Sequence, residues 1–331
     1  MKKRKTTARI AAAALALVTA IGLCSCSGGA GGGSDTGTKT YTVGICQLAQ
    51  HPALDAATKG FRAALVDKLG DKVKFDEQNA SGETPNCNTI INSFISKNVD
   101  LILANATPAL QTAASATEDI PILGTAVTEY GSALNIADFN GTVGGNVSGT
   151  SDLASLSDQA KMFKELLPDV KTVGLLYCSS EANSLYQVKV IADELKKLGI
   201  DSQQFAFSDG NDLAAVTTAA IGKCDALYVP TDNTIASSTG IIDGICRPAK
   251  VPVIAGEEGI CSGCGIATLS INYYDLGYTT GLMAAKILTG EAKISEMPIE
   301  YAPKVTKKYN AEICKELGIT VSDEYTAIET E

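Results

Sequence analysis

The chain has 331 residues, a formal charge of −10, one His and no Trp. This length is sufficient for two domains of ordinary size. The first 25 residues hold five basic side chains and no acidic one, so the rest of the chain carries −15. So acidic a chain is poorly suited to nucleic acid or to anionic lipid surfaces, and we expect no nucleic-acid partner.

The first 25 residues predict a lipoprotein signal peptide. A basic segment at 1–5 precedes an apolar stretch at 10–23, which is too short to cross a membrane comfortably. It ends in Leu23-Cys24-Ser25-Cys26, which resembles a bacterial lipobox with Cys26 as the lipid acceptor. Residues 26–39 are glycine-rich and predict a flexible tether. We expect a lipid anchor on the extracytoplasmic face of the cell membrane; the alternative is an ordinary signal peptide with incidental cysteines.

From residue 40 onward, strands and helices are expected to alternate. Apolar runs at 41–48, 72–76, 101–104 and 120–127 predict strands, and apolar side chains at helical spacing predict helices near 54–69 and 84–97. The third strand leads into an alanine-rich helix, with Thr107 at the expected N-cap and Pro108 at the first helical position. Free N–H groups at such a helix start can bind a carboxylate, although most strand-to-helix turns bind nothing.

Residues 140–152 interrupt this alternation with four glycines and predict a crossing between domains. They do not form a phosphate-binding fingerprint. The alternation then restarts, with strands expected at 172–177, 201–207, 225–230, 251–255 and 265–272. Two successive halves of this kind predict an α/β protein with a parallel, doubly wound sheet in each of two lobes, around a ligand cleft.

Ligands of open parallel sheets bind beyond the carboxyl ends of the strands. In the first half, neutral amides and hydroxyls follow the strands: Gln47, Asn79, Asn105, Thr107, Thr125 and Thr128. In the second half, carboxylates join them: Asn183, Ser184, Asp232, Asn233 and Glu257. This asymmetry fits an amino acid, with its carboxylate at Thr107 and Thr128 and its ammonium at Asp232, joined by Glu257. Each residue taken alone is better explained as a cap or turn.

Eight cysteines follow Cys26, and their pairing cannot be read from the sequence: Cys46, Cys87, Cys178, Cys224, Cys246, Cys261, Cys264 and Cys314. Cys261-Ser-Gly-Cys264 is flanked by glycines, which predicts a turn rather than the helix start that a redox motif needs. A single CxxC also supplies only two of the four ligands of zinc. We expect a local disulfide or two free thiols there, and no metal site.

A set of short motifs recurs in this chain in a fixed order: His51-Pro-Ala-Leu-Asp55, Gln78-Asn79-Ala80, Ala106-Thr107-Pro108, Thr125-Ala-Val-Thr128, Asn146-Val-Ser-Gly149 with Ser151-Asp152, Glu181-Ala-Asn183-Ser184, Thr231-Asp232-Asn233 and Tyr273-Tyr274-Asp275-Leu276-Gly277. As a set, over about residues 41–317, they resemble the substrate-binding lipoproteins of ABC transporters that are often described as tryptophan/tyrosine-binding. No single motif is specific.

The resemblance implies the type I periplasmic-binding fold, in which two α/β lobes joined by three crossings close around a ligand. It implies a first lobe of residues 40–148 plus about 258–298, and a second of 149–257 plus about 299–331. It further implies an aromatic or related amino acid as the ligand. Delivery would be to a membrane permease partnered with an ATPase, since this chain has no phosphate-binding loop. We expect a monomer with no cofactor.

Two other functions remain open from the sequence. The same fold can carry a sugar or a nucleoside, although such sites usually stack aromatic rings, which make up only 5% of this chain. A surface thiol-redox protein could use Cys261 and Cys264. We expect no enzyme activity: there is no GxSxG elbow, and His51, the only His, precedes Pro52 where a capping or positioning role is expected.

Overall fold

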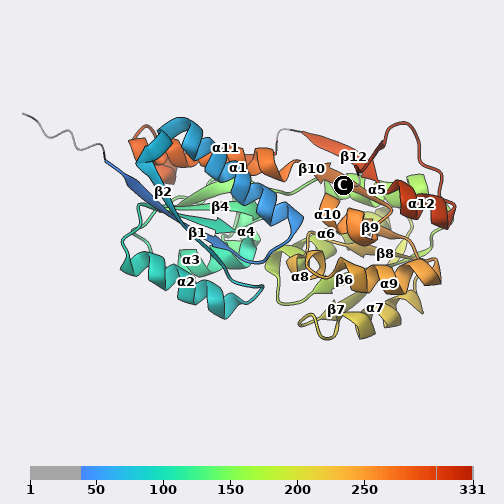
Figure 1. Ribbon diagram of the computed structural model, residues 1–331. Helices are drawn as coiled ribbons and strands as arrows, with labels where there is room; N and C mark the ends of the chain where they lie inside the picture. The colour runs from blue at the N-terminus through green and yellow to red at the C-terminus, as the bar shows by residue number, and fades with distance from the viewer. Residues whose placement is uncertain (1–38, 303, 330–331) are drawn as a thin grey trace, which may run out of the picture. The chain divides into compact units, whose positions relative to one another are not determined.

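Two β-sheets, each covered by helices, organise the chain (Figure 1). The computed structural model describes residues 39–302 and 304–329, all within one unit, Lys39–Glu331, that makes its own internal contacts. The expected signal peptide, the lipid acceptor Cys26 and nearly all of the expected tether lie outside the described residues. Within those residues, no helix is both long enough and apolar enough to span a bilayer.

The first sheet has six strands in the order β11-β5-β4-β3-β1-β2, and all neighbouring pairs are parallel. Its strands are β1 (Tyr41–Gln47), β2 (Val73–Asn79), β3 (Leu101–Asn105), β4 (Ile122–Val127), β5 (Val147–Ser151) and β11 (Glu300–Tyr301). Every residue of β3, β4 and β5 is buried, as expected for central strands of a sheet covered on both faces.

The second sheet has seven strands in the order β13-β12-β10-β9-β8-β6-β7. They are β6 (Thr172–Cys178), β7 (Asp201–Phe207), β8 (Ala226–Val229), β9 (Val253–Ala255), β10 (Ala267–Ile271), β12 (Val305–Tyr309) and β13 (Thr326–Ala327). All neighbours are parallel except β10 and β12. The expected doubly wound parallel sheet in each lobe is therefore confirmed, with one antiparallel pair near an edge.

Each sheet and its helices form one lobe. The first lobe has α1 (Pro52–Leu69), η1 (Gly70–Lys72), α2 (Thr84–Ser96), α3 (Thr107–Ala116), α4 (Tyr130–Leu134), α11 (Tyr273–Thr289) and η2 (Ile294–Glu296). The second lobe has α5 (Leu156–Leu166), α6 (Ala182–Lys197), α7 (Leu213–Ile221), α8 (Asn233–Ala236), α9 (Thr239–Ala249), α10 (Glu258–Cys264) and α12 (Ala311–Leu317). Buried apolar clusters lie on the faces of both sheets.

Helices α1 and α11 pack side by side on the first lobe, although they lie more than 200 residues apart in sequence (Figure 1). Glycines allow this close approach: a Cβ on Gly277 would overlap the carbonyl oxygen of Ala57, and one on Gly60 would overlap that of Tyr274. The packing fixes the first residues of both helices, which contribute to the pocket described below.

The chain crosses between lobes after β5, between β10 and α11, and between β11 and β12. These positions correct the expected boundaries. The glycine-rich residues 140–149 belong to the first lobe, and the first crossing follows them at 152–155. Residues 258–271 belong to the second lobe because β10 pairs with β9 and β12, and residues 300–301 belong to the first because β11 pairs with β5.

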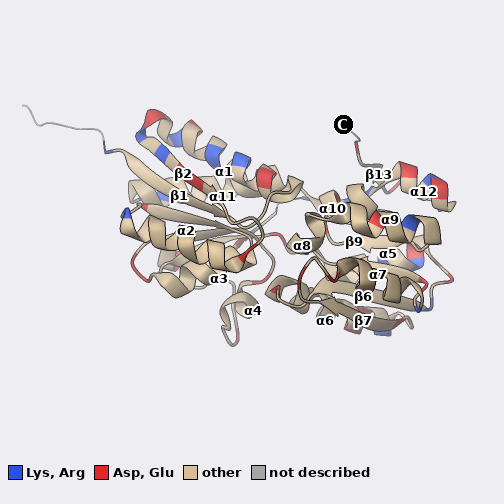
Figure 2. Cartoon of the chain, turned by 60° about the horizontal axis from the view of Figure 1, so that its bottom comes forward, with Lys and Arg blue, Asp and Glu red and all other residues tan. Residues whose placement is uncertain are grey.

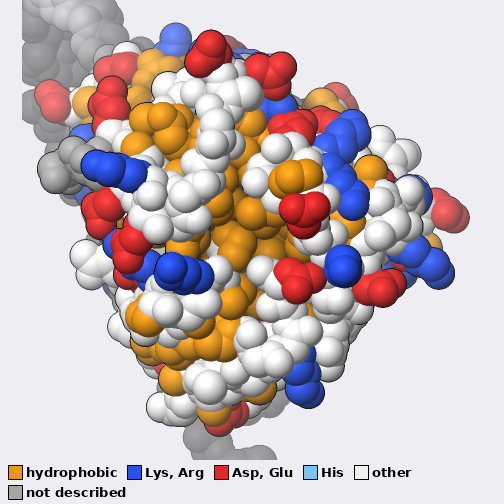
Figure 3. Space-filling view, turned by 90° about the vertical axis from the view of Figure 1, so that its right-hand side faces the viewer, with side chains coloured by type: hydrophobic (Ala, Val, Ile, Leu, Met, Phe, Trp, Pro, Cys, Tyr) orange, Lys and Arg blue, Asp and Glu red, His pale blue; other side chains and the backbone are white. Residues whose placement is uncertain are grey.

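Helices α1 and α12 carry charged residues of both signs (Figure 2). On the far end of the second lobe, apolar side chains form a band bordered by both acidic and basic residues (Figure 3).

Candidate functional site

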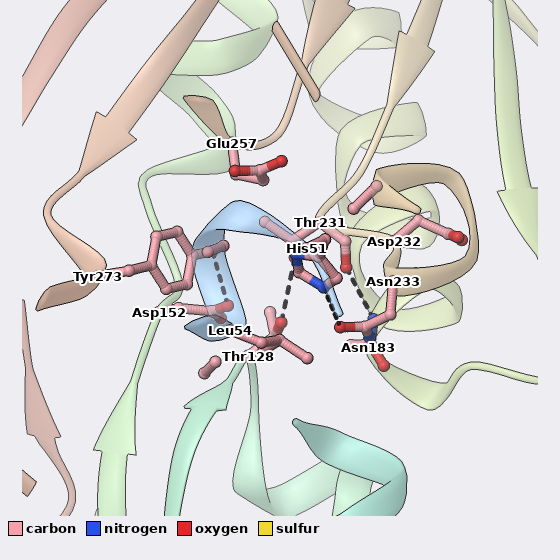
Figure 4. A pocket seen from close by; sticks show the side chains of 13 residues that line it. His51, Leu54, Thr128, Asp152, Asn183, Thr231, Asp232, Asn233, Glu257 and Tyr273 are labelled. Atoms are coloured by element: carbon pink, nitrogen blue, oxygen red, sulfur yellow. Dashed lines mark hydrogen bonds between the residues drawn. The ribbon is translucent and has the colours of Figure 1, made fainter. Parts of the chain in front are cut away.

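A pocket lies between the two lobes, where the carboxyl ends of strands from both sheets meet (Figure 4). It is lined by His51, Ala53, Leu54, Ala126, Thr128, Asp152, Asn183, Thr231, Asp232, Asn233, Ala236, Glu257 and Tyr273. Its free volume is about 10 Å³, the space of roughly one water molecule. A ligand larger than a water molecule can therefore enter only when the lobes move apart.

Two hydrogen bonds join the lobes directly across this pocket. His51, at the N-cap of α1, places Nε2 at 3.3 Å from Oδ1 of Asn233 at the start of α8. The hydroxyls of Thr128 and Thr231 lie 3.2 Å apart. Both contacts connect side chains that start from loops after strands, so small lobe rotations would make or break them.

Asp152 occupies the first crossing and is one of the most buried carboxylates of the described chain. Its Oδ2 accepts a hydrogen bond of 3.0 Å from the hydroxyl of Tyr273, the first residue of α11, while its Oδ1 has no partner. Burial raises the pKa of Asp152, and the nearby hydroxyls of Thr128 and Tyr273 offset part of that rise. This carboxylate is thus set at the junction of two crossings with one oxygen free.

Asp232 also lines the pocket, but both of its oxygens are engaged by its own lobe. Oδ1 accepts from the N–H of Ile235 at 3.0 Å and so caps α8, while Oδ2 accepts from the N–H of Cys178 at 2.7 Å and from the hydroxyl of Ser184 at 2.8 Å. Burial raises the pKa of Asp232 to about 8, with the nearby Glu181 adding to the rise. Asp232 is primarily a structural cap.

Glu257, like Asp232, uses both of its carboxylate oxygens within its own lobe. It is the N-cap of α10, and its two oxygens accept from the N–H groups of Gly259 and Ile260. Burial raises its pKa to about 7, and those two backbone hydrogen bonds oppose the rise. Of the three carboxylates that line the pocket, only Asp152 keeps an oxygen free of protein partners.

Asn183 is held in one orientation at the start of α6. Its Nδ2 donates to Oε2 of Glu181 at 3.0 Å and to the carbonyl of Thr231 at 2.8 Å, so its Oδ1 is left without a partner. Glu181 in turn accepts from the backbone and side chain of Asn233. This network fixes the polar wall contributed by the second lobe.

Two alanines at strand ends of the first lobe have strained backbones. Ala126 lies within an irregularity in the pairing of β4 with β5 and has φ of 51°. Ala106, just after β3, has φ of 95° and ψ of 156°. Such conformations are uncommon for residues with a Cβ and concentrate at functional sites. Ala126 lines the pocket.

The expectation for Thr107 is corrected. The helix α3 begins at Thr107, its N-cap is Ala106, and no side chain caps it. Pro108 is the second helical residue rather than the first. The hydroxyl of Thr107 is buried and has no partner, so it remains available at the helix start although Thr107 is not among the pocket-lining residues.

The structure brings five of the eleven expected site residues to the pocket: Thr128, Asn183, Asp232, Asn233 and Glu257. The other side chains near strand ends make internal contacts. Thr125 belongs to a buried hydroxyl cluster with Thr150 and Thr280. Ser184 binds Asp232. Whether the five contact a ligand stays a prediction.

The remaining expected residues support the first lobe. Gln47 binds Asp55 and Thr58, and Asn105 donates to the carbonyl of Leu54 and to the hydroxyl of Thr58, so both brace the first turn of α1 behind the pocket. Asn79 accepts from the N–H of Ser81 in a turn and lines a separate surface groove with Gln47.

The rule that ligands bind beyond the carboxyl ends of strands did not identify three of the pocket residues: His51, Asp152 and Tyr273. His51 follows β1 by several residues, Asp152 follows a strand that the glycine-rich sequence concealed, and Tyr273 begins a helix after a crossing. The signal that could have found them was their presence in the recurring motifs, where all three occur.

No cysteine is among the described residues that line the pocket. All eight from Cys46 to Cys314 are buried and free, and Cys261 and Cys264 lie within the helix α10 rather than in the expected turn. Burial raises the pKa of both thiols well above the ordinary value, the opposite of what a redox nucleophile needs. In the part of the chain that the structure describes, no three metal-ligating side chains cluster as a metal site would require.

Comparison with known proteins agrees with this architecture. The family model for ABC transporter substrate binding proteins matches residues 42–331. A tyrosine-binding protein of Clostridioides difficile (strain R20291) is 40% identical over 264 residues, which cover 79% of this chain and 76% of the relative.

Two solved structures are also similar. An ABC domain from Streptococcus pneumoniae in complex with L-Trp has 34% identity and a TM-score of 0.82, covering 86% of this chain and 97% of its own. The ligand-free, open structure of a substrate-binding protein with adhesive properties from Clostridium difficile has 37% identity and a TM-score of 0.67. The match covers 88% of this chain and 100% of that structure's chain. The fold is that of the type I periplasmic-binding proteins. The chain therefore belongs to the family of ABC transporter substrate-binding proteins, which bind solutes and are not enzymes.

Proposed function

We propose that this protein is the extracytoplasmic, lipid-anchored receptor of an ABC importer, and that it captures an aromatic amino acid between its lobes. The observation that carries this proposal is the pocket itself, whose wall comes from both lobes and from the first crossing. A ligand that contacts both lobes stabilises their closed arrangement, which is the signal that a transporter can recognise.

The chemistry of the wall favours an amino acid. Three carboxylates line the pocket and no Lys or Arg does, which favours a positively charged group on the ligand. Ala53, Leu54, Ala126, Ala236 and the ring of Tyr273 give the same wall an apolar part, which suits an apolar or aromatic side chain. The relatives described as tyrosine-binding and as a complex with L-Trp agree with this choice.

The carboxylate of the ligand would bind on the first lobe. The ten-residue helix α3 presents free N–H groups at its start, and the buried hydroxyl of Thr107 there lacks a partner. Thr128, at the end of β4, offers a second hydroxyl from the pocket wall. We therefore propose that Thr107 and Thr128 bind the carboxylate of the ligand, as expected from the sequence.

Closure follows from the contacts across the pocket. The bonds from His51 to Asn233 and from Thr128 to Thr231 would form as the lobes approach, with rotation at the three crossings. The chain resembles the L-Trp complex more than the open structure by TM-score, although its sequence is less similar to the former. The higher TM-score with the L-Trp complex supports a closed arrangement of the two lobes in this structure.

Delivery requires partners that this chain does not supply. We propose a membrane permease with an associated ATPase as the partners, and a lipid on Cys26 that keeps the monomeric receptor at the membrane surface. Palmitate incorporation that is lost in Cys26→Ser, but retained in Cys24→Ser, would support the anchor; labelling unchanged by Cys26→Ser would contradict it.

A thermal-shift screen tests the ligand class. The chain from Lys39 onward would be unfolded and refolded to remove carried-over ligand, then heated with twenty amino acids, common sugars and nucleosides. A ligand at a hundred times its Kd stabilises the folded state by about 2.7 kcal/mol, a rise in Tm of roughly 5 °C or more for a domain of this size. A response to tyrosine, tryptophan or phenylalanine supports the proposal; a response only to sugars or nucleosides contradicts it.

A further inference from the structure

Three polar atoms without hydrogen-bond partners belong to side chains that line the same pocket. Among the described residues, the buried side-chain atoms without a hydrogen-bond partner include Nδ1 of His51, Oδ1 of Asp152 and Oδ1 of Asn183, and all three side chains line the pocket. Their residues are 6%, 5% and 4% exposed. An unpartnered buried polar atom is costly, so three that share one cavity indicate a ligand that satisfies them.

The protein contacts of each residue define the free atom as an acceptor. The Nδ2 of Asn183 donates to Glu181 and Thr231, which leaves the carbonyl Oδ1 as the atom without a partner. Asp152 keeps a carboxylate oxygen, since its other oxygen accepts from Tyr273.

The tautomer of His51 follows from Asn233. The Nδ2 of Asn233 donates to Glu181, so its Oδ1 is an acceptor and Nε2 of His51 must carry the proton. In a neutral imidazole the other nitrogen, Nδ1, is then an acceptor. Burial lowers the pKa of His51, which favours that neutral form.

The three acceptors come from three different parts of the fold. His51 begins α1 of the first lobe, Asp152 lies on the first crossing, and Asn183 is at the start of α6 of the second lobe (Figure 4). A primary ammonium has three N–H donors and no acceptor, which matches this set in number and in charge. It would bridge both lobes and the crossing at once.

From this geometry we infer that His51, Asp152 and Asn183 form the seat for the ammonium group of the ligand, each accepting one N–H. This inference deepens the proposed function and rests on it. It replaces Asp232 in the ammonium role that the sequence suggested, because both oxygens of Asp232 are already engaged by the second lobe. It also gives the only histidine of the chain a role in ligand selection.

A series of N-methylated ligands tests the seat without changing the protein. Calorimetric affinities would be compared for L-tryptophan and for its N-methyl, N,N-dimethyl and N,N,N-trimethyl derivatives, with α-methyl-tryptophan as the control that adds bulk but keeps three N–H donors. We expect a loss of about 10-fold for each donor removed, since each removal leaves one buried acceptor unpaired. Trimethyl-tryptophan keeps its positive charge, so equal affinity for it would show that charge alone is recognised and would overturn the inference.

The role of Asp152 can be tested by changing this residue in the protein and the amino group in the ligand, separately and together. In Asp152→Asn, an isosteric change, L-tyrosine should bind about 10- to 100-fold more weakly, whereas 3-(4-hydroxyphenyl)propanoate, which lacks the amino group, should lose little. Glu258→Gln is the control, because Glu258 neighbours Glu257 but binds Lys308 and Ser270 and does not line the pocket. Equal losses for both ligands, or none, would overturn the inference and leave the proposed function standing. Failure of every amino acid to bind wild type would overturn both.

Discussion

The hydroxyl of Tyr273 holds Asp152 in position where two crossings between the lobes meet. Removing this hydroxyl measures what the hydrogen bond contributes to the free energy of unfolding. Tyr273 is 8% exposed and donates to Oδ2 of Asp152 at 3.0 Å. Tyr273→Phe keeps the ring and deletes the donor. A hydrogen bond to a charged group contributes about 1.5–3 kcal/mol, so we expect the free energy of unfolding at pH 8 to fall by about 2 kcal/mol.

The loss should depend on pH, with a sign that follows from Asp152. Burial raises the pKa of Asp152 above its unfolded value, and the bond from Tyr273 limits that rise. The folded state therefore binds the proton more tightly than the unfolded chain, and ionisation of Asp152 lowers stability as the pH rises through and above about 4. Tyr273→Phe enlarges this effect, so the variant should be destabilised less at pH 4.5, where more of Asp152 is protonated, than at pH 8.

Urea denaturation of both proteins at pH 4.5 and pH 8 measures the difference. Tyr274→Phe is the matched control, since Tyr274 is the next residue and its ring stacks on Tyr278 at 6.3 Å between centroids. A destabilisation by Tyr273→Phe that is the same at both pH values, or larger at pH 4.5, would refute the reasoning.

Three further changes probe the scaffold. Gly277→Ala should cost about 1–3 kcal/mol in urea denaturation, because its Cβ would overlap the backbone of α1, whereas Gly244→Ala in the open interior of α9 should be neutral or stabilising; equal effects would contradict the packing. Ala106→Gly should raise the free energy of unfolding by about 1 kcal/mol by relieving its backbone strain, and a lower stability in the same assay would argue against strain. All eight cysteines from Cys46 to Cys314 should react with a thiol reagent only after denaturation, and fewer than eight reactive thiols would reveal a disulfide.

The sequence predicted many of the strands and the two-lobed architecture because buried strands such as β3 are apolar up to their last residue, which is Asn105 in β3. It could not assign short strands to a sheet. The two-residue strand β11 pairs with β5, and β10 pairs with β9 and β12, and these pairings depend on tertiary neighbours rather than on local pattern. The expected lobe boundaries therefore needed correction at 258–271 and 300–301.

Part of the candidate site could be predicted, because the ends of the strands can be located from the sequence. The strand-end rule found Asn183 and Thr128, but it could not separate a carboxylate that caps a helix from one that is free. Asp232 and Asp152 have the same side chain, and only their partners distinguish them: three donors engage Asp232, while Oδ1 of Asp152 has none. That distinction exists only in three dimensions.

The central claim is that an aromatic amino acid binds between the lobes. Isothermal titration of the refolded chain from Lys39 onward with L-tyrosine and with L-tryptophan tests it most directly. We expect one ligand per chain, with Kd in the ~micromolar range, near −8 kcal/mol, and a negative heat-capacity change from burial of the aromatic ring. Absence of binding by both amino acids, with saturable binding of a sugar or nucleoside instead, would contradict the account.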